Sequence, residues 1–418
     1  MKVSKDLSII YLFSTTIPLF SILNKGYYIT PYDTPTYLSA WDSLMTGKLD
    51  WFRTPVYPLF LGIIKHIAAS KFELTVNMVQ YVFMLISVYC FYHIAQRLKL
   101  SKTIVFWTTL FYGTCPSVFY WCRAILTESL SISFLVFLVF CLFRLYDHYS
   151  IKWAVTNGIL LLILQMLRPS FIYLLPLYAV FFFCLYFDDK KRKQAIAGLI
   201  GTCVAISVII GYMSLFRQQY GIFATSSVST INRLYIARQY GLLIPNDIEN
   251  AQLRKDLQLS ISNHGICRDG EDNGIIFGEI LYYINNYDLK TLNIVLNQSL
   301  QNYPKQHLYY TGVRFVKSIH DDFIRTLGNY VIFDLLYLYV FMLIYGILLF
   351  IWIIKHHTIP LLSSILYFAV VGNILISIIG AQLDWGRLLS HSIPLVILLF
   401  GQFCSLAQQK SLARFEMV

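Results

Sequence analysis

Long apolar runs dominate the pattern of hydrophobic and polar positions along this 418-residue chain. About ten of them are long enough to cross roughly 30 Å of hydrocarbon as helices. They occupy residues 7–24, 74–96, 103–120, 125–143, 152–167, 170–187, 194–215, 330–354, 359–380 and 388–408. Arg168-Pro169 divides the fifth run from the sixth, which therefore form two helices or one re-entrant pair. The pattern predicts an all-α polytopic membrane protein.

Two short helices are predicted in the loop that follows the first run. Thr34-Pro35 and Thr54-Pro55 each place a capping hydroxyl before a proline suited to the first helical position. After the first proline, apolar residues recur at helical spacing until Gly47, which supplies a left-handed stop. We expect both helices to lie at the membrane interface.

The apolar runs divide the chain into three parts. Residues 1–215 form the first membrane module, with its first outer loop at 25–72. The polar insertion at 216–328 has helical periodicity broken by Asn, Gly and Pro304, and predicts a small, mostly helical domain. Residues 329–418 hold the last membrane helices.

Composition and charge agree with a membrane protein. Hydrophobic residues make up 57% of the chain, charged residues only 13%, and the mean hydropathy is +0.59. The net charge of +11 is spread over loops. No basic and aromatic cluster indicates nucleic-acid binding, so this charge is interpreted as topology and contact with membrane lipid.

Basic residues predict the orientation. Loops on one side of the predicted membrane hold most of the lysines and arginines, including the run Lys190-Lys191-Arg192-Lys193. By the positive-inside rule both termini are cytoplasmic, in a multi-pass plasma (inner) membrane protein. The loop at 25–72 and the insertion at 216–328 then face the periplasm or the cell exterior.

The eight cysteines do not form a disulfide framework. Most lie in apolar runs, where cysteine is a small core residue. Cys115 and Cys122 flank a predicted outer hairpin and could pair, which would leave Cys267 alone. No Cys/His spacing is typical of zinc.

Charged residues collect at the predicted outer boundary of the membrane. They are Asp33, Asp42, Arg53, Arg123, Glu128, Arg168, Asp384 and Arg387. Local pairs, Arg123 with Glu128 and Asp384 with Arg387, would satisfy some of these charges. A shared polar cavity accounts for the whole set more economically.

This set suits chemistry on a lipid-linked phosphate. A guanidinium binds phosphate bidentately and stays charged, and the phosphate available at this depth is that of a lipid carrier. A carboxylate at a helix N-terminus can take a proton from an acceptor hydroxyl. Because a polyprenyl phosphate leaves without a proton, one essential acid suffices where a glycosidase needs two.

Several motifs resemble those of the GT-C glycosyltransferases, in particular protein O-mannosyltransferases and aminoarabinose transferases. Asp33, Tyr37, Ala40, Leu44 and Gly47 resemble their first outer loop, as does the string RTPVYPLFL from Arg53. The resemblance extends to RAILTESL from Arg123, and to Gly386-Arg387-Leu388 before Ile393-Pro394-Leu395. It covers most of the membrane part but not residues 216–328.

The resemblance implies an inverting transfer from a polyprenyl-phosphate sugar, with Asp33 as the general base. Arg387, and Arg123 or Arg168, would meet the donor phosphate. Close relatives of the mannosyltransferases carry two adjacent acids, whereas Thr34 follows Asp33 here. This departure leaves open the acceptor, which is a glycan, lipid or protein, and the use of a divalent metal.

The remaining candidates have plainer alternatives. Asp42 is a possible second acid or part of a solvated face. Arg53 contacts substrate or lipid headgroups, and Tyr57 is a candidate substrate contact or an ordinary interfacial aromatic. Glu128 is a candidate substrate-binding residue, and Arg168 could simply extend toward the interface from a helix end.

Two other functions compete with glycosyl transfer from a polyprenyl phosphate. A polysaccharide polymerase or ligase of the O-antigen type also uses outer arginines on a lipid-linked glycan, but seldom needs an acid after its first helix. A transporter or flippase should carry charges near mid-membrane and repeated halves. Neither feature is present in this sequence, so this third function is the weakest.

Overall fold

The computed structural model describes residues 5–25, 33–265, 273–325, 331–381 and 384–415. Most of these residues are helical. The first helices are α1 (Lys5–Lys25), α2 (Asp33–Met45), α3 (Val56–Ala68), α4 (Phe72–Arg97), α5 (Lys102–Thr114), α6 (Pro116–Phe119), α7 (Glu128–Asp147), α8 (Ile151–Leu167), α9 (Leu174–Tyr186) and α10 (Arg192–Tyr220). Then follow α11 (Val228–Gln239), α12 (Ala251–His264), α13 (Asn273–Asn286), α14 (Leu289–Asn302), α15 (Pro304–Ser318), α16 (Leu335–His356), α17 (Leu361–Gly380), α18 (Trp385–Leu389) and α19 (Ile393–Phe415).

Within the described residues, 7 helical segments are long and apolar enough to cross a membrane. The all-α polytopic class is therefore confirmed, but the predicted number of ten spans is not. Helix α8 is a shorter apolar helix, the run at 7–24 forms the 21-residue helix α1, and the run at 103–120 is divided between α5 and α6. The run at 103–120 is broken because Pro116 starts a new helix and Cys115 before it is extended.

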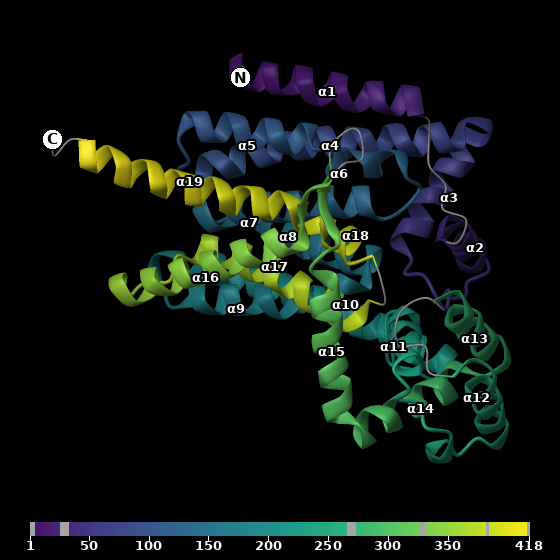
Figure 1. Cartoon of the computed structure of the whole chain (residues 1–418). Helices are drawn as coiled ribbons and strands as arrows, with labels where there is room; N and C mark the ends of the chain where they lie inside the picture. The colour runs from purple at the N-terminus through teal and green to yellow at the C-terminus, as the bar shows by residue number, and fades with distance from the viewer. Residues whose placement is uncertain (1–4, 26–32, 266–272, 326–330, 382–383, 416–418) are drawn as a thin grey trace.

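The long helices lie side by side in one bundle around a single large apolar core (Figure 1). Helix α4 packs on α7, and α10 packs on both α8 and α9. The α8–α10 contact is close, because a Cβ on Gly158 would lie 2.8 Å from the backbone oxygen of Gly201. Small residues allow such approach between apolar helices, where packing drives association.

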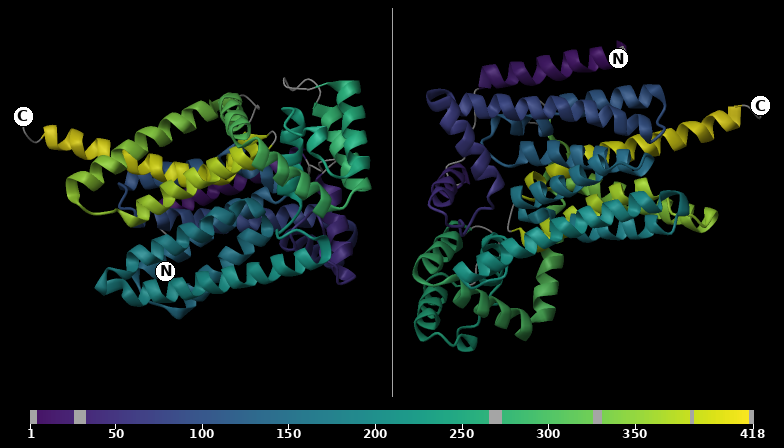
Figure 2. Two further views of the ribbon diagram at one scale, coloured as in Figure 1. Left: turned by 90° about the horizontal axis from the view of Figure 1, so that it is seen from below. Right: turned by 180° about the vertical axis from the view of Figure 1, so that it is seen from behind.

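Helices α11 to α14 form a separate group at one end of the bundle, with their own apolar core (Figures 1 and 2). They lie within the insertion predicted at 216–328, although α10 continues into its start and ends at Tyr220. Both chain ends lie toward the opposite end of the bundle in both views. The division into three domains stays a prediction.

The first outer loop contains the two expected helices, α2 and α3, but they begin differently from the prediction. Thr34 lies inside α2, and its hydroxyl donates to the carbonyl oxygen of Ile125 at 3.2 Å. Thr34 therefore ties α2 to the segment before α7. Helix α3 begins at Val56, and its N-cap position is Pro55 rather than Thr54. Gly47 follows α2 with φ +74°, which confirms the left-handed stop.

A short β-hairpin, absent from the predicted elements, covers α18. Strand β1 (Asp322–Arg325) pairs antiparallel with β2 (Val331–Asp334), with Asp322 opposite Asp334. The backbone N–H of Gly386 donates to Asp321 Oδ2 at 3.2 Å. A Cβ on Gly386 would lie 2.0 Å from the carbonyl oxygen of Asp322, so only glycine fits beneath the strand.

The possible Cys115–Cys122 disulfide is not formed. Both residues are buried free cysteines, consistent with the role of small apolar core residues. Cys267 lies outside the described residues.

We expect Gly386→Ala to lower the free energy of unfolding of the purified protein by about 1–3 kcal/mol, and with it the melting temperature. The added methyl group would lie too close to the backbone of β1. Gly312→Ala in α15 is the matched control, since a Cβ there meets nothing within 4 Å. Alanine should be neutral or slightly stabilising at that site. Thermal unfolding followed by tryptophan fluorescence checks both variants, and equal melting temperatures would contradict the close packing.

Candidate active site

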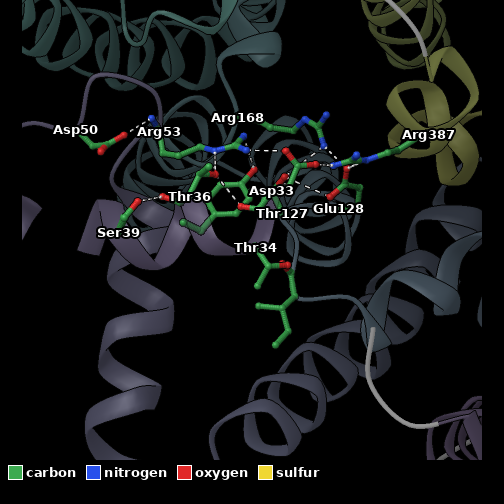
Figure 3. Close-up of polar contacts among 12 residues, drawn as sticks. Asp33, Thr34, Thr36, Ser39, Asp50, Arg53, Thr127, Glu128, Arg168 and Arg387 are labelled. Atoms are coloured by element: carbon green, nitrogen blue, oxygen red, sulfur yellow. Dashed lines mark hydrogen bonds and ion pairs between the residues drawn. The ribbon is translucent and has the colours of Figure 1, made fainter. Parts of the chain in front are cut away.

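Five charged side chains from distant parts of the sequence meet at the end of the bundle near α11 (Figures 1 and 3). Asp33 is the first residue of α2, and Arg53 precedes α3. Glu128 is the first residue of α7, Arg168 follows α8, and Arg387 lies in α18. We call these five residues the Asp33–Arg387 cluster.

Asp33 binds two guanidinium groups, one at each carboxylate oxygen. Its Oδ1 accepts from Arg53 Nη2 at 2.7 Å, and its Oδ2 accepts from Arg387 Nη2 at 2.9 Å. The side chain is 28% exposed, so solvent or a substrate reaches it. Asp33 is therefore the accessible acid of the cluster.

Arg53 is fixed on all sides by neighbouring groups. Its Nε donates to Thr36 Oγ1 at 2.7 Å, and its Nη1 donates to Tyr37 Oη at 3.2 Å. The guanidinium lies 4.1 Å above the Tyr37 ring and 4.3 Å from the Phe52 ring centre. Asp50 Oδ1 accepts from the backbone N–H of Arg53 at 2.6 Å, which fixes the turn that carries this arginine. Arg53 therefore holds Asp33 in a defined orientation.

Arg387 connects the two acids of the cluster. While its Nη2 binds Asp33, its Nε donates to Glu128 Oε1 at 2.5 Å. Its Nη1 bonds to no residue in the described part of the chain. The guanidinium thus keeps N–H donors that can turn to a third anion.

Glu128 forms the buried floor of the cluster. Its side chain has no exposed area, and Oε1 also forms an ion pair with Arg168 Nη1 at 2.9 Å. Arg168 Nη1 in addition approaches Thr127 Oγ1 and His391 Nε2, each at 3.2 Å. His391 Nδ1 lies 2.7 Å from the carbonyl oxygen of Leu388, so Nδ1 carries the proton and Nε2 accepts from Arg168.

The cluster has a surplus of positive charge. Three arginines face two carboxylates, which leaves a net charge of +1. A buried charge is costly without a partner, and an anionic ligand would supply one. The arrangement therefore favours the binding of an anion beside Asp33.

Asp33 is ionised at neutral pH. Burial raises its pKa, but the guanidinium groups of Arg53 and Arg387 outweigh burial and hold the pKa below its ordinary value. Because the folded pKa lies below the unfolded one, ionised Asp33 stabilises the fold above about pH 4. This contribution is lost as the pH falls through the folded pKa.

Three of the predicted boundary charges lie outside the cluster. Asp42 and Asp384 are exposed. Arg123 is buried, with its guanidinium 5.6 Å from the Tyr120 ring centre. The local pairs considered from the sequence are not formed, because Glu128 pairs with Arg168 and Arg387 instead.

Tyr57, a predicted substrate contact, lies behind the cluster. It is fully buried, and its hydroxyl donates to Gln80 Oε1 at 3.1 Å. Its ring meets that of Tyr37 edge-on at 4.9 Å. Tyr57 therefore supports the tyrosine against which Arg53 stacks.

Sequence reasoning missed three polar residues that hold the arginines. Thr36 and Thr127 carry only common hydroxyls, and no local pattern singles them out. His391 had a detectable signal, because it follows Arg387 by four residues and residues so spaced share one helix face. Its position inside the apolar run at 388–408 was the second clue.

No group of three or more His, Cys, Asp and Glu side chains suited to a metal ion occurs among the described residues. Asp33 and Glu128 are each bound by two arginines. The sequence left the use of a divalent metal open, and these contacts do not change that.

Known proteins resemble the chain in part of its sequence and in its fold. A family model described as dolichyl-phosphate-mannose-protein mannosyltransferase matches residues 53–214, which include Arg53, Glu128 and Arg168. Among curated proteins, none matches the sequence.

The oligosaccharyltransferase AglB from Archaeoglobus fulgidus, in complex with an inhibitory peptide and a dolichol-phosphate, has a similar fold. The TM-score is 0.51 at 10% sequence identity, over 97% of this chain and 50% of AglB. A structure of an Archaeoglobus fulgidus oligosaccharyltransferase in complex with Zn and sulfate also gives a TM-score of 0.51 at 10% identity, over 97% of this chain and 49% of that one.

The likeness to these structures shows that the membrane part and the helices beside it share their fold. The predicted resemblance is confirmed, because part of the chain matches a mannosyltransferase family model and the fold is similar to that of an oligosaccharyltransferase, both of them GT-C proteins. The chain spans about half the length of the solved structures that it matches.

We expect the two acids to differ in their effect on stability. Glu128→Gln should lower the free energy of unfolding by about 3–5 kcal/mol, because it removes the buried carboxylate that pairs with Arg168 and one of the two carboxylates that pair with Arg387. Asp33→Asn should cost less, since water reaches this side chain. Thermal unfolding of both variants in the same detergent tests the difference, and an equal or larger loss for Asp33→Asn would contradict it.

Proposed function

We propose that this protein transfers a sugar from a polyprenyl phosphate to an acceptor hydroxyl at the outer face of the membrane. In this proposal the transfer inverts the anomeric centre and Asp33 is the general base. The observation that carries the proposal is the accessible Asp33 carboxylate held between Arg53 and Arg387. Asp33 supplies the base, and Arg387, bonded to it, supplies the group that binds an anion.

The donor phosphate would bind at Arg387. This arginine keeps free Nη1 donors in the described structure, and the cluster has a surplus positive charge for a phosphodiester. The matching family is named for dolichyl-phosphate mannose, and one similar structure holds a dolichol-phosphate. Both names support a lipid-linked donor for this chain.

The reaction proposed is a single displacement. The acceptor oxygen forms a bond to the anomeric carbon while the bond from that carbon to the phosphate oxygen breaks. The acceptor proton passes to Asp33, and the polyprenyl phosphate leaves with the electron pair. The negative charge on the phosphate grows from about −1 to about −2, and Arg387 stabilises this growing negative charge in the transition state.

Donor binding would also raise the pKa of Asp33. In the free protein two arginines depress the pKa of Asp33, which makes it a weak base. A phosphate that engages Arg387 would draw part of this guanidinium's interaction away from Asp33. The pKa of Asp33 would then rise toward the working range only when donor is present.

The other predicted residues take supporting roles in the proposal. Glu128 and Arg168 hold Arg387 from the buried side, and Tyr57 supports Arg53 through Tyr37. Arg168 is a further candidate for the phosphate, as its Nη2 bonds to no described residue. Arg123 and Asp42 lie apart from the bonded network and remain weaker candidates.

We also propose that the Asp33–Arg387 cluster and helices α11 to α15 face the periplasm or cell exterior. Both chain ends lie toward the other end of the bundle (Figure 2). Loops rich in lysine and arginine lie toward that end too, which supports cytoplasmic termini. The acceptor is a glycan, lipid or protein at the outer face.

We expect Asp33→Asn to lower the transfer rate by about 10²–10⁴-fold, because the amide cannot take the acceptor proton. Asp42→Asn is the matched control and should retain most activity, since Asp42 is exposed and outside the cluster. Transfer from a radiolabelled polyprenyl-phosphate sugar measures both. Comparable activity in Asp33→Asn would remove the proposed mechanism.

Arg387→Lys should raise the KM for the lipid-linked donor by about 10-fold or more, because lysine lacks the fork that binds Asp33 and phosphate together. Arg217→Lys, at an exposed position of α10, is the control. Initial rates against donor concentration provide the measurement. A donor dependence like that of the wild type would show that Arg387 has a structural role only.

A further inference from the structure

A second polar site lies at the far end of the bundle from the Asp33–Arg387 cluster. A cavity of about 270 Å³ opens between the C-terminal parts of α4 and α7. Its lining residues are His93, Ile94, Gln96, Arg97, Phe140, Phe143, Arg144 and Asp147. Along α7, Arg144 is sixteen residues from Glu128, or about 24 Å at the helical rise. The cavity is therefore separate from the candidate active site.

Asp147 is the one acidic residue that lines the cavity, and Arg97 neutralises its charge. Arg97 binds Asp147 in a fork, with Nε 2.7 Å from Oδ1 and 2.6 Å from Oδ2. Arg97 Nη2 also donates to Oδ1 at 2.5 Å. The pair is part-buried and geometrically fixed, so it forms one wall of the cavity and contributes no net charge.

Arg144 is an exposed lining residue and supplies a positive charge. It makes no ion pair with a carboxylate in the described part of the chain, and its guanidinium lies 5.1 Å from the Phe140 ring centre. A second cation is near the lining residue Arg97, because Lys191 Nζ and the Arg97 guanidinium lie 3.0 Å and 5.9 Å from the same Tyr146 ring centre. The cavity and its rim therefore attract anions.

The lining residue His93 provides a buried ring nitrogen, Nε2. Its Nε2 is buried without a hydrogen bond to any described residue. The ring is held edge-on by Tyr89 at 4.4 Å and by Tyr92 at 5.6 Å. Buried polar atoms are rarely left unsatisfied, so a bound molecule is expected to hydrogen-bond Nε2.

We propose that this cavity binds a phosphate group, with Arg144 as its counter-charge and His93 as its hydrogen-bond partner. Ligand cavities for whole small molecules span about 300–1,000 Å³, so this one fits a phosphate headgroup and not a complete lipid-linked sugar. Ile94, Phe140 and Phe143 supply apolar walls for the carbon atoms next to the phosphate. The group belongs to an anionic membrane lipid or to a soluble phosphate ester.

Positive residues at this end of the bundle also have a simple role in topology, and the test separates that role from binding. The test uses the full-length protein, delipidated in detergent, as wild type, Arg144→Gln and Lys152→Gln. Lys152 is exposed at the start of α8 and is not a lining residue, so its variant removes the same charge without touching the cavity. His93→Phe keeps the ring and removes the nitrogen.

Native mass spectrometry measures retention of dioleoylphosphatidylglycerol and of dioleoylglycerol, which lacks phosphate. Thermal shift measures inorganic phosphate. We expect the wild type and Lys152→Gln to retain phosphatidylglycerol over dioleoylglycerol, and Arg144→Gln and His93→Phe to bind it about 10-fold more weakly. A shift with phosphate that Arg144→Gln abolishes, without lipid preference, would assign a soluble phosphate ester instead.

Equal retention of the two lipids together with no thermal shift by phosphate would overturn the proposal. So would equal losses in Arg144→Gln and Lys152→Gln, since only the total charge would then matter. None of these residues belongs to the Asp33–Arg387 cluster, so the outcome does not depend on the glycosyl-transfer proposal.

Discussion

The bridge that Arg387 forms between Asp33 and Glu128 is the interaction on which the site depends. Asp33 precedes Arg387 by 354 positions in the chain, and Glu128 precedes it by 259. Through it, the first outer loop, the start of α7 and the short helix α18 are fixed at one place. Asp321, beside the hairpin, binds the backbone of Gly386 next to this arginine, and Arg168 shares the Glu128 carboxylate with it.

The two acids in contact with Arg387 have different surroundings: Glu128 is fully buried, whereas Asp33 is accessible. Glu128 is fully buried with two arginines, where a charge is stable only while its partners stay in place. Asp33 is part-exposed and carries arginines on both oxygens. In the proposed function, the fixed inner ion pair preorganises the outer acid to bind an anion and take a proton.

The sequence predicted the membrane class because apolar length and basic loops are local properties of the chain. It also identified all five members of the Asp33–Arg387 cluster as boundary charges. Pairing between them was not predictable, since Arg123 was an equally plausible partner for Glu128. The residues between Arg123 and α7 are not helical, so Arg123 turns toward Tyr120 instead. The hydroxyl of Thr34 likewise found an acceptor in Ile125, far from the helix end it was expected to cap.

By itself, the sequence determined which segments are apolar helices, where the charged residues gather and which superfamily the motifs resemble. Only the tertiary structure decided which charges meet, that His391 contacts Arg168, and that a hairpin covers Gly386. The physical reason is range. Hydrophobic periodicity acts over a few residues, whereas an ion pair forms between whichever charges the packed helices bring within about 4 Å.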